Sequence, residues 1–256
     1  FESMPQVDSF ILGLTEQCNL RCTYCCYSGN YVNKRSHNTV SMSTENVDDI
    51  LAFIDSFTSK RPIKIFLYGG EPLLNYNIVQ YAIEESRIQW DNDVSFTIST
   101  NGTTLTKERI DWLVVNNVVL ALSIDGTKPF HDSYRVDAQG NGSYTRVYDA
   151  LKYIKTTYPE YAKEMSLIMT LASFDKIVDI AEAWNNDEVL RDWAPTMMNS
   201  LAPNFSKGVD KADYEEVKEF YDVLLDTYEQ HQDIVQQTPD TYRRKQKRYC
   251  RVMQKP

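Results

Sequence analysis

Short apolar runs alternate with amphipathic helical patterns over most of this 256-residue chain. We predict the apolar runs to be strands, because they are short and end in polar or glycine-rich residues. The segments between them carry apolar residues at helical spacing. Strict alternation of strands and helices favours a parallel sheet joined by right-handed crossovers. The pattern therefore predicts six βα units and an α/β fold, a complete or partial barrel.

The individual elements follow from the same periodicities. The predicted strands cover residues 10–14, 63–68, 94–98, 118–123, 165–171 and 193–198. The predicted helices cover 75–88, 106–116, 144–157, 175–186 and 211–231, and a further helix begins at a cap formed by Ser43 or Thr44 and reaches Phe57. Sites in such folds lie at the C-terminal ends of the strands.

Composition narrows the class of protein. No run approaches the roughly 20 apolar residues that a membrane span needs, and residues 1–5 do not resemble a signal peptide. Cytoplasm is therefore the expected location, with no membrane partner. The net charge of −9 argues against nucleic acid as a partner. The basic run 243–248 is interpreted as a solvated or disordered segment.

Four of the five cysteines fall between residues 18 and 26, directly after the first predicted strand. Clustered cysteines of this kind indicate a metal site rather than a disulfide framework. One interpretation is buried or zinc-binding thiols, although zinc knuckles come in pairs and the only other cysteine is Cys250. The other is that Cys18, Cys22 and Cys25 hold three irons of a four-iron cluster and leave the fourth iron open.

Three further strand ends carry polar or glycine-rich residues, namely 69–71, 99–101 and 123–125. Since parallel strands end at one edge of the sheet, we expect these residues to meet the cysteines at one site. Gly69 and Gly70 would let a ligand approach the backbone, or would simply form a tight turn. Ser99, Asn101 and Ser123 could bind hydroxyl groups, or could serve as turn and cap residues.

The spacing of Cys18, Cys22, Tyr24 and Cys25 matches CxxxCxΦC, with an aromatic residue at Φ, and so resembles the radical S-adenosylmethionine (radical SAM) enzymes. The resemblance implies a partial (β/α)6 TIM-like barrel of the radical SAM type, with a 4Fe–4S cluster on the three cysteines. It also implies SAM bound to the open iron, with its amine at Gly69, Gly70 and Glu71 and its ribose or carboxylate at Ser99, Asn101 and Ser123. Cys26 falls outside the spacing.

The resemblance suggests three more SAM contacts. Tyr24 would pack on the adenine, and Leu171 would line the same pocket. Arg135 of the sequence His131–Asp132–Ser133–Tyr134–Arg135 would pair with the SAM carboxylate, or alternatively form a surface Asp–Arg pair. His131 is interpreted as a packing or capping histidine.

Over residues 8–200 the motifs are similar to those of SPASM-type peptide maturases, especially makers of cysteine thioether bonds. This resemblance implies a precursor peptide as substrate, an electron donor such as flavodoxin or ferredoxin, and auxiliary 4Fe–4S clusters in a C-terminal domain. We expect that domain to be truncated or absent here. We expect a radical SAM barrel over 1–205, a helical extension over 206–240 and the incomplete start of an auxiliary-cluster region over 241–256. Cys250 would be its first ligand or an inert thiol.

The implied chemistry is reductive cleavage of SAM, abstraction of a substrate hydrogen by the 5′-deoxyadenosyl radical and closure of a thioether or related crosslink. Two alternatives remain. An anaerobic sulfatase-maturating enzyme would use the same motifs to make formylglycine. A non-catalytic iron–sulfur or zinc-binding interaction protein would have no need of the glycine–glycine–glutamate motif.

Overall fold

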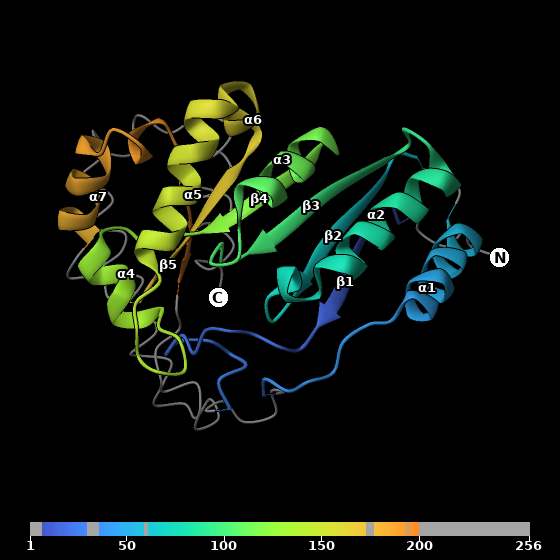
Figure 1. Ribbon diagram of the computed structural model, residues 1–256, viewed down its shortest axis with the longest axis horizontal. Coiled ribbons are helices and arrows are strands. Elements are labelled where there is room, and N and C mark those ends of the chain that lie inside the picture. The colour runs from blue at the N-terminus through green and yellow to red at the C-terminus, as the bar shows by residue number, and fades with distance from the viewer. Residues whose placement is uncertain (1–6, 30–35, 59–60, 173–176, 194, 200–256) are drawn as a thin grey trace, which may run out of the picture.

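The computed structural model describes residues 7–29, 36–58, 61–172, 177–193 and 195–199. These residues form six parallel strands that pair in chain order into one sheet (Figure 1). The strands are β1 (Ser9–Thr15), β2 (Ile63–Gly69), β3 (Val94–Thr100), β4 (Val118–Ser123), β5 (Ser166–Leu171) and β6 (Thr196–Asn199). The helices are α1 (Thr44–Phe57), α2 (Tyr76–Trp90), α3 (Lys107–Val115), α4 (Lys128–Tyr134), α5 (Tyr144–Thr157), α6 (Pro159–Glu164) and α7 (Ile177–Asn186), with the short 3-10 helices η1 (Pro72–Asn75) and η2 (Leu190–Asp192). The expected α/β partial barrel is confirmed.

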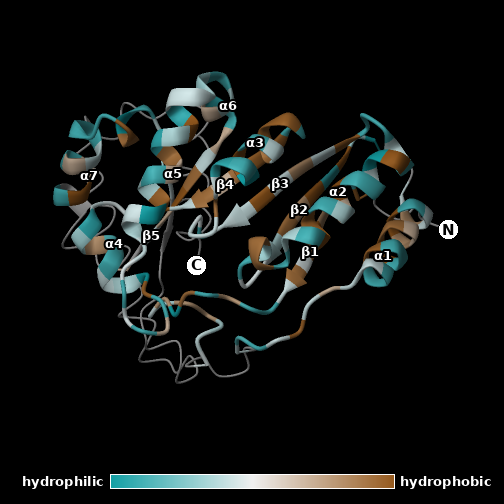
Figure 2. Cartoon of the chain, viewed as in Figure 1, coloured by the Kyte–Doolittle hydropathy of each residue, from teal (hydrophilic) through white to brown (hydrophobic). Residues whose placement is uncertain are grey.

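One face of the sheet forms the hydrophobic core with the helices. Alternate side chains of β1, β2 and β3 are at most 2 % exposed, as successive residues of a strand point to opposite faces. These are Leu12, Leu14, Ile63, Ile65, Leu67, Phe96 and Ile98. They belong to one cluster with Val47 and Leu51 of α1 and with Val79 and Ile83 of α2. Figure 2 shows brown, apolar stretches along the strands, interrupted by paler residues, and helices with mixed hydropathy.

The opposite face of the sheet, which we call the inner face, is the inside of the incomplete barrel. Its β1 and β2 side chains are accessible: Ile11 is 73 %, Phe66 39 % and Tyr68 42 % exposed. A Cβ added at Gly13 would meet no atom within 4 Å. The inner face is therefore partly apolar and open at the β1–β2 end.

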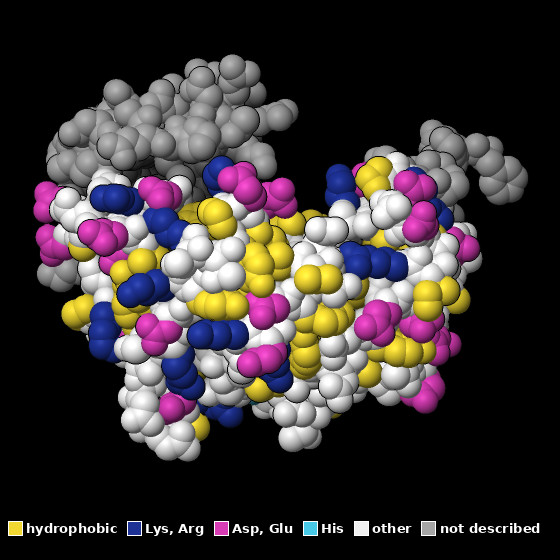
Figure 3. Space-filling view, turned by 45° about the horizontal axis from the view of Figure 1, so that its top comes forward, with side chains coloured by type: hydrophobic (Ala, Val, Ile, Leu, Met, Phe, Trp, Pro, Cys, Tyr) yellow, Lys and Arg dark blue, Asp and Glu magenta, His cyan; other side chains and the backbone are white. Residues whose placement is uncertain are grey.

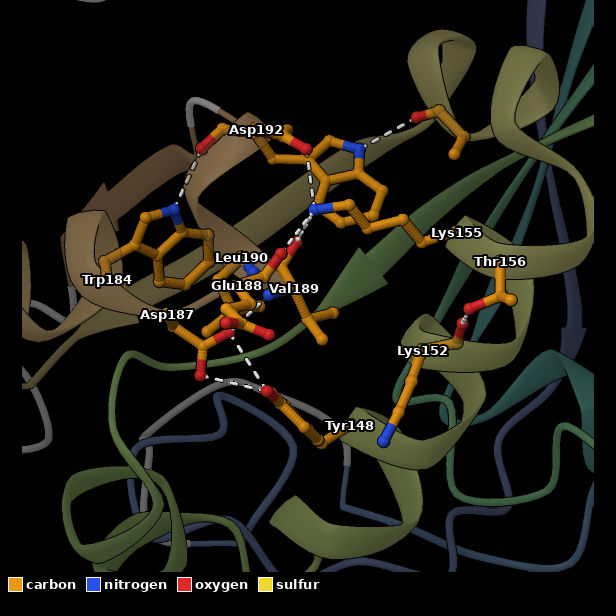
Figure 4. Close-up of polar contacts among 12 residues, drawn as sticks. Tyr148, Lys152, Lys155, Thr156, Trp184, Asp187, Glu188, Val189, Leu190 and Asp192 are labelled. Carbon is orange, nitrogen blue, oxygen red and sulfur yellow. Dashed lines mark hydrogen bonds and ion pairs between the residues drawn. The ribbon is translucent and has the colours of Figure 1, made fainter.

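The final βα unit is fastened to α5 by the polar contacts drawn in Figure 4. Lys155 of α5 donates through Nζ to the carbonyl oxygens of Glu188 (2.6 Å) and Val189 (3.0 Å). It also forms an ion pair with Asp192 of η2 at 2.6 Å. These contacts hold the connection between α7 and β6 against the rest of the molecule.

Several element boundaries differ from the sequence-based expectation. β3 continues to Thr100, so Ser99 and Thr100 lie within the strand rather than after it. Helices α4 and α6 were not predicted, because elements of seven and six residues are too short to show a periodic pattern. The predicted helix 211–231, the expected regions 206–240 and 241–256, the basic run 243–248 and Cys250 lie outside the described residues.

None of the helices in the described ranges is both long and apolar enough to cross a bilayer. On the face shown in Figure 3, acidic and basic side chains are interspersed among hydrophobic ones.

Candidate functional site

The three motif cysteines lie in the loop that leaves the C-terminal end of β1, and within the described part of the chain none of them forms a disulfide bond. Cys22 is buried, Cys18 and Cys25 are half-buried, and Cys26 is exposed. Burial raises the pKa of the Cys18 thiol and raises that of Cys22 to about 12. Such thiols become thiolates beside a strong positive charge, which bound iron would provide.

The donor set of the site consists of three cysteines on one loop. Cys18, Cys22 and Cys25 lie close enough for their charges to interact electrostatically. Among the described residues, however, no three Cys, His, Asp or Glu side chains are close enough to hold one metal ion. In a four-iron cluster each cysteine binds a different iron, so its sulfur atoms stand further apart than the ligands of one zinc ion. Three thiols on one loop are therefore a donor set that a four-iron cluster can use.

The cysteine loop, residues 16–29, pairs through its backbone with the segment that follows α4. The N–H of Arg21 donates to the carbonyl oxygen of Val136 at 2.6 Å. Next to it, Leu20 and Asp137 form an isolated antiparallel bridge. Backbone pairing fixes the loop whatever the side chains are, so the sequence pattern carried no sign of it.

The two glycines at the end of β2 touch the start of the same loop. A Cβ at Gly69 would overlap the carbonyl oxygen of Thr15, and one at Gly70 would overlap that of Gln17. The N–H of Gly70 donates to the carbonyl oxygen of Thr15 at 2.8 Å. Glycine is therefore required here so that two protein backbones can meet, in addition to any role toward a ligand.

Glu71 is fully buried, and its carboxylate accepts hydrogen bonds from other groups of the protein. Its Oε1 accepts hydrogen bonds from Thr100 Oγ1 (2.7 Å) and the N–H of Leu73 (3.1 Å). Its Oε2 accepts one from the N–H of Asn101 at 2.7 Å. Burial nevertheless raises the pKa of this carboxyl. Glu71 thus joins the end of β2 to the end of β3; its expected contact with the SAM amine stays a prediction.

Of the polar residues expected on β3 and β4, Asn101 lies next to a cysteine. Ser99 and Ser123 are half-buried on adjacent strands, at positions whose side chains face the inner face. Asn101 is 8 % exposed, and its Nδ2 lies 3.8 Å from the sulfur of Cys18. Asn101 therefore lies beside the cysteine loop, and the roles of Ser99 and Ser123 toward SAM stay predictions.

Tyr24 of the cysteine motif is tied to the end of β4. Its hydroxyl donates to Asp125 Oδ2, and Arg135 Nε donates to the same oxygen at 2.7 Å. The other oxygen, Oδ1, accepts from the N–H of Thr170 at 2.8 Å. The Arg135 guanidinium carbon lies 5.5 Å from the centroid of the Tyr24 ring.

Asp125 and Arg135 therefore form a buried ion pair, with side chains 0 % and 8 % exposed, and not the surface pair considered as an alternative. The role of Arg135 toward the SAM carboxylate and that of Tyr24 toward the adenine stay predictions.

His131 supports the same region in its neutral form. Its Nδ1 accepts the N–H of Asp125 at 3.1 Å. Its Nε2 lies 2.9 Å from Ser143 Oγ, and that hydroxyl donates its proton to the carbonyl oxygen of Arg135. The proton between His131 and Ser143 therefore belongs to Nε2. Burial lowers the pKa of His131 to about 4, consistent with a packing role.

The sequence did not reveal the residues whose hydrogen bonds connect the cysteine loop and the strand ends to one another. Thr100 and Asn19 belong to no recognised motif, and Asp125 was expected only as one of the polar residues at a strand end. For Asp125 the available signal was its place directly after a strand. Leu171 ends β5, but its side chain lies outside the described part of the structure, as does Cys250.

The fold and the site define a class of protein: a partial barrel of parallel strands with a cysteine-rich cofactor site at the C-terminal ends of its strands. The model of the radical SAM superfamily matches residues 12–183. The chain belongs to this superfamily of enzymes, which use a 4Fe–4S cluster and SAM.

Known relatives include several radical SAM enzymes. The chain is 30 % identical over 162 residues to a cysteine-type anaerobic sulfatase-maturating enzyme of Clostridium novyi (strain NT), covering 62 % of this chain and 43 % of the relative. It is 23 % identical over 241 residues to the radical SAM cyclopropyl synthase TigE of Paramaledivibacter caminithermalis (strain DSM 15212 / CIP 107654 / DViRD3), covering 88 % of this chain and 48 % of that enzyme. The chain thus spans less than half the length of either relative.

Solved structures with the same fold include native anSMEcpe with bound AdoMet and Cp18Cys peptide. Its TM-score is 0.61 at 20 % identity, covering 78 % of this chain and 52 % of that one. At this identity the likeness concerns the fold alone.

Proposed function

We propose that this chain is the SAM-cleaving part of a peptide-modifying enzyme that forms a thioether or related crosslink in a ribosomal precursor peptide. The observation that carries the proposal is the meeting of the cysteine loop with the ends of β2, β3 and β4 through direct contacts. The naming of sulfatase-maturating enzymes and a cyclopropyl synthase among the relatives supports a maturase.

Each residue has a defined task in this proposal. Cys18, Cys22 and Cys25 hold the cluster, which when bound supplies the electron that cleaves the SAM sulfonium bond. Backbone groups of Gly69 and Gly70 bind the SAM amine, and Ser99 and Ser123 bind its ribose and carboxylate. Asn101, expected from the sequence to share this task, has its amide bonded to protein groups beside the site. Arg135, Tyr24 and Leu171 complete the SAM pocket.

The inner face would receive the peptide. Ile11, Phe66 and Tyr68 offer apolar surface to its side chains beside the SAM site. Thioether closure removes a hydrogen atom from a peptide carbon to the deoxyadenosyl group, a proton from a cysteine thiol and one electron to an acceptor. An auxiliary cluster in a C-terminal region is the acceptor we propose, and flavodoxin or ferredoxin the donor for SAM cleavage.

The first test is anaerobic reconstitution with iron and sulfide, reduction, addition of SAM and chromatography for 5′-deoxyadenosine. We expect product from the wild type and none from a variant with Cys18, Cys22 and Cys25 changed to alanine. A loaded wild-type cluster that yields no product would reject SAM cleavage by this chain and favour the non-catalytic alternative.

Formylglycine formation is the second candidate, supported by the sulfatase-maturating relative. Incubation with a cysteine-containing precursor peptide separates the two. A thioether product is lighter by two hydrogen atoms, keeps its sulfur and resists alkylation at the crosslinked cysteine. A formylglycine product has lost the sulfur and reacts with a carbonyl reagent.

Glu71→Ala tests the prediction that Glu71 contributes to SAM binding and not to ligation of the cluster. We expect SAM affinity to fall about tenfold, or about 1.4 kcal/mol, while iron content is retained, because the variant frees the ends of β2 and β3 but keeps every cysteine. Equilibrium dialysis with labelled SAM and an iron assay measure the two quantities. Unchanged affinity would contradict the assignment.

A further inference from the structure

The sulfur of Cys18 lies beside two N–H groups of the protein. The backbone N–H of Leu20, within the cysteine loop, donates to it at 3.4 Å. The side-chain Nδ2 of Asn101, from the end of β3, lies 3.8 Å from the same sulfur. The second donor is separated from Cys18 by 83 residues of sequence, so the fold brings it there.

The orientation of the Asn101 amide is fixed by its neighbours. Its Oδ1 accepts the backbone N–H of Thr103 at 3.0 Å and the hydroxyl of Thr103 at 2.6 Å. A backbone N–H can only donate, so the oxygen must be on that side and the nitrogen must face Cys18. One amide N–H donates to Asn19 Oδ1 at 3.0 Å, which leaves the other for the sulfur.

The position of Asn101 is fixed as well. Its backbone N–H donates to the buried carboxylate of Glu71 at 2.7 Å, and its side chain is nearly inaccessible. A donor that is held at both backbone and side chain keeps its direction when the cluster changes charge.

We propose that Asn101 is a positioning residue that sets the reduction potential of the cluster by donating an N–H···S hydrogen bond to the Cys18 thiolate. Hydrogen bonds to cluster sulfurs favour the reduced state, which carries one more negative charge, and therefore raise the potential. The inference rests on the proposed ligation of the cluster by Cys18. It assigns to the β3 end a task that does not require contact with SAM.

The test is a potentiometric titration of the reconstituted full chain, followed by the electron paramagnetic resonance signal of the reduced cluster without SAM. Asn101→Leu keeps the approximate size of the side chain and removes the donor. We expect its reduction equilibrium to shift tenfold toward the oxidised form, equivalent to a midpoint about 59 mV more negative. An unchanged midpoint with a fully loaded cluster would overturn the inference.

Thr103→Val is the matched control. It removes a hydroxyl from the same hydrogen-bonded group and leaves the backbone N–H that orients the Asn101 amide. We expect the midpoint of this variant to equal that of the wild type. A shift as large as that of Asn101→Leu would assign the effect to general disturbance of the site and overturn the inference.

A measurement on folded wild type covers the case in which Asn101→Leu does not fold. Protein labelled with ¹⁵N only in asparagine side chains should show a nitrogen coupling to the reduced cluster in pulsed spectra, retained in Asn19→Ala. Absence of the coupling would reject the hydrogen bond.

Iron analysis of Cys18→Ala separates the two proposals. Retention of a normal cluster would remove Cys18 from the proposed site and the inference with it. Loss of the cluster in Cys18→Ala, together with an unshifted Asn101→Leu, would overturn the inference alone.

Discussion

At Gly70 the approach of two backbones determines which side chain is tolerated. A Cβ there would overlap the carbonyl oxygen of Gln17, which belongs to the cysteine loop and cannot rotate away as a side chain can. At Gly13 an added Cβ would meet nothing within 4 Å. The chain thus supplies its own comparison between a glycine that the site requires and one that it does not.

We expect Gly70→Ala to lower the free energy of unfolding by about 2 kcal/mol, as overpacking typically does, and to lower iron loading because the loop is displaced. Gly13→Ala should change stability by less than about 1 kcal/mol and leave loading intact. Urea unfolding and iron analysis measure both effects. Equal stability and loading in the two variants would show that the loop adapts.

His131 should make stability depend on pH. Burial holds its pKa at about 4 in the folded protein, whereas an unfolded histidine has a pKa of about 6.5. Between these values the unfolded chain binds the extra proton, so stability is lost as the pH falls from about 6.5 toward 4.

The expected loss through His131 is about 2.5 kcal/mol between pH 7 and pH 4.5. His131→Gln can accept and donate at the same two sites but does not titrate in this range. Urea unfolding at both pH values should therefore show a smaller pH dependence for the variant, by about that amount. Parallel pH profiles would mean that His131 is not held neutral.

Helices and strands with a clear local sequence pattern could be predicted. Short elements, and contacts between residues far apart in the sequence, could not. The predicted cap of the first helix is confirmed: Ser43 accepts the N–H of Asn46, and the Asn46 side chain accepts the N–H of Ser43. Helix α4 gave no periodic signal. The side chain that Tyr24 contacts lies 101 residues away, at Asp125. The sequence placed residues at strand ends, but which of them bond to one another depends on distances across the sheet.

Asp187, which follows α7, connects α5 to the segment that leads into η2. It accepts the Tyr148 hydroxyl at 3.0 Å and the N–H groups of Val189 and Leu190 at 2.8 and 2.9 Å, contacts visible in Figure 4. Asp187→Ala leaves three donors without their partner. At about 1 kcal/mol for each bond, we expect a loss of about 3 kcal/mol in the free energy of unfolding.

The control for Asp187→Ala is Lys163→Ala, which removes an exposed ion pair with Glu160 on α6. Such pairs contribute about 0.5 kcal/mol or less. Urea unfolding compares the two variants. A loss in Asp187→Ala no larger than that in Lys163→Ala would show that the hydrogen bonds of Asp187 do not stabilise this segment.

At the scale of the whole molecule, the accessible inner face allows the proposed peptide site to be changed without disturbing the hydrophobic core. Gly13 lies on that face opposite Tyr68 and has open space above it. A leucine there would occupy the space proposed for the peptide without disturbing the core. We expect Gly13→Leu to retain the wild-type free energy of unfolding within about 1 kcal/mol and to lose at least tenfold in peptide modification.

Paired measurements of unfolding and of modified peptide by mass spectrometry test this. Gly13→Ala serves as the control, since its side chain is too small to fill the space. Undiminished modification by Gly13→Leu would place the peptide elsewhere.

The order of the sheet also bears on how the molecule is made. Each strand pairs with the one synthesised just before it, so the sheet can grow while the chain leaves the ribosome. The cysteine loop cannot form its contacts in the same order. Asn101, which contacts Cys18, is translated 83 residues after it, and Asp125, which contacts Tyr24, is translated 101 residues after it. A nascent chain therefore exposes its cysteines well before they can be held in place, and iron delivery belongs after the first half of the barrel has been translated.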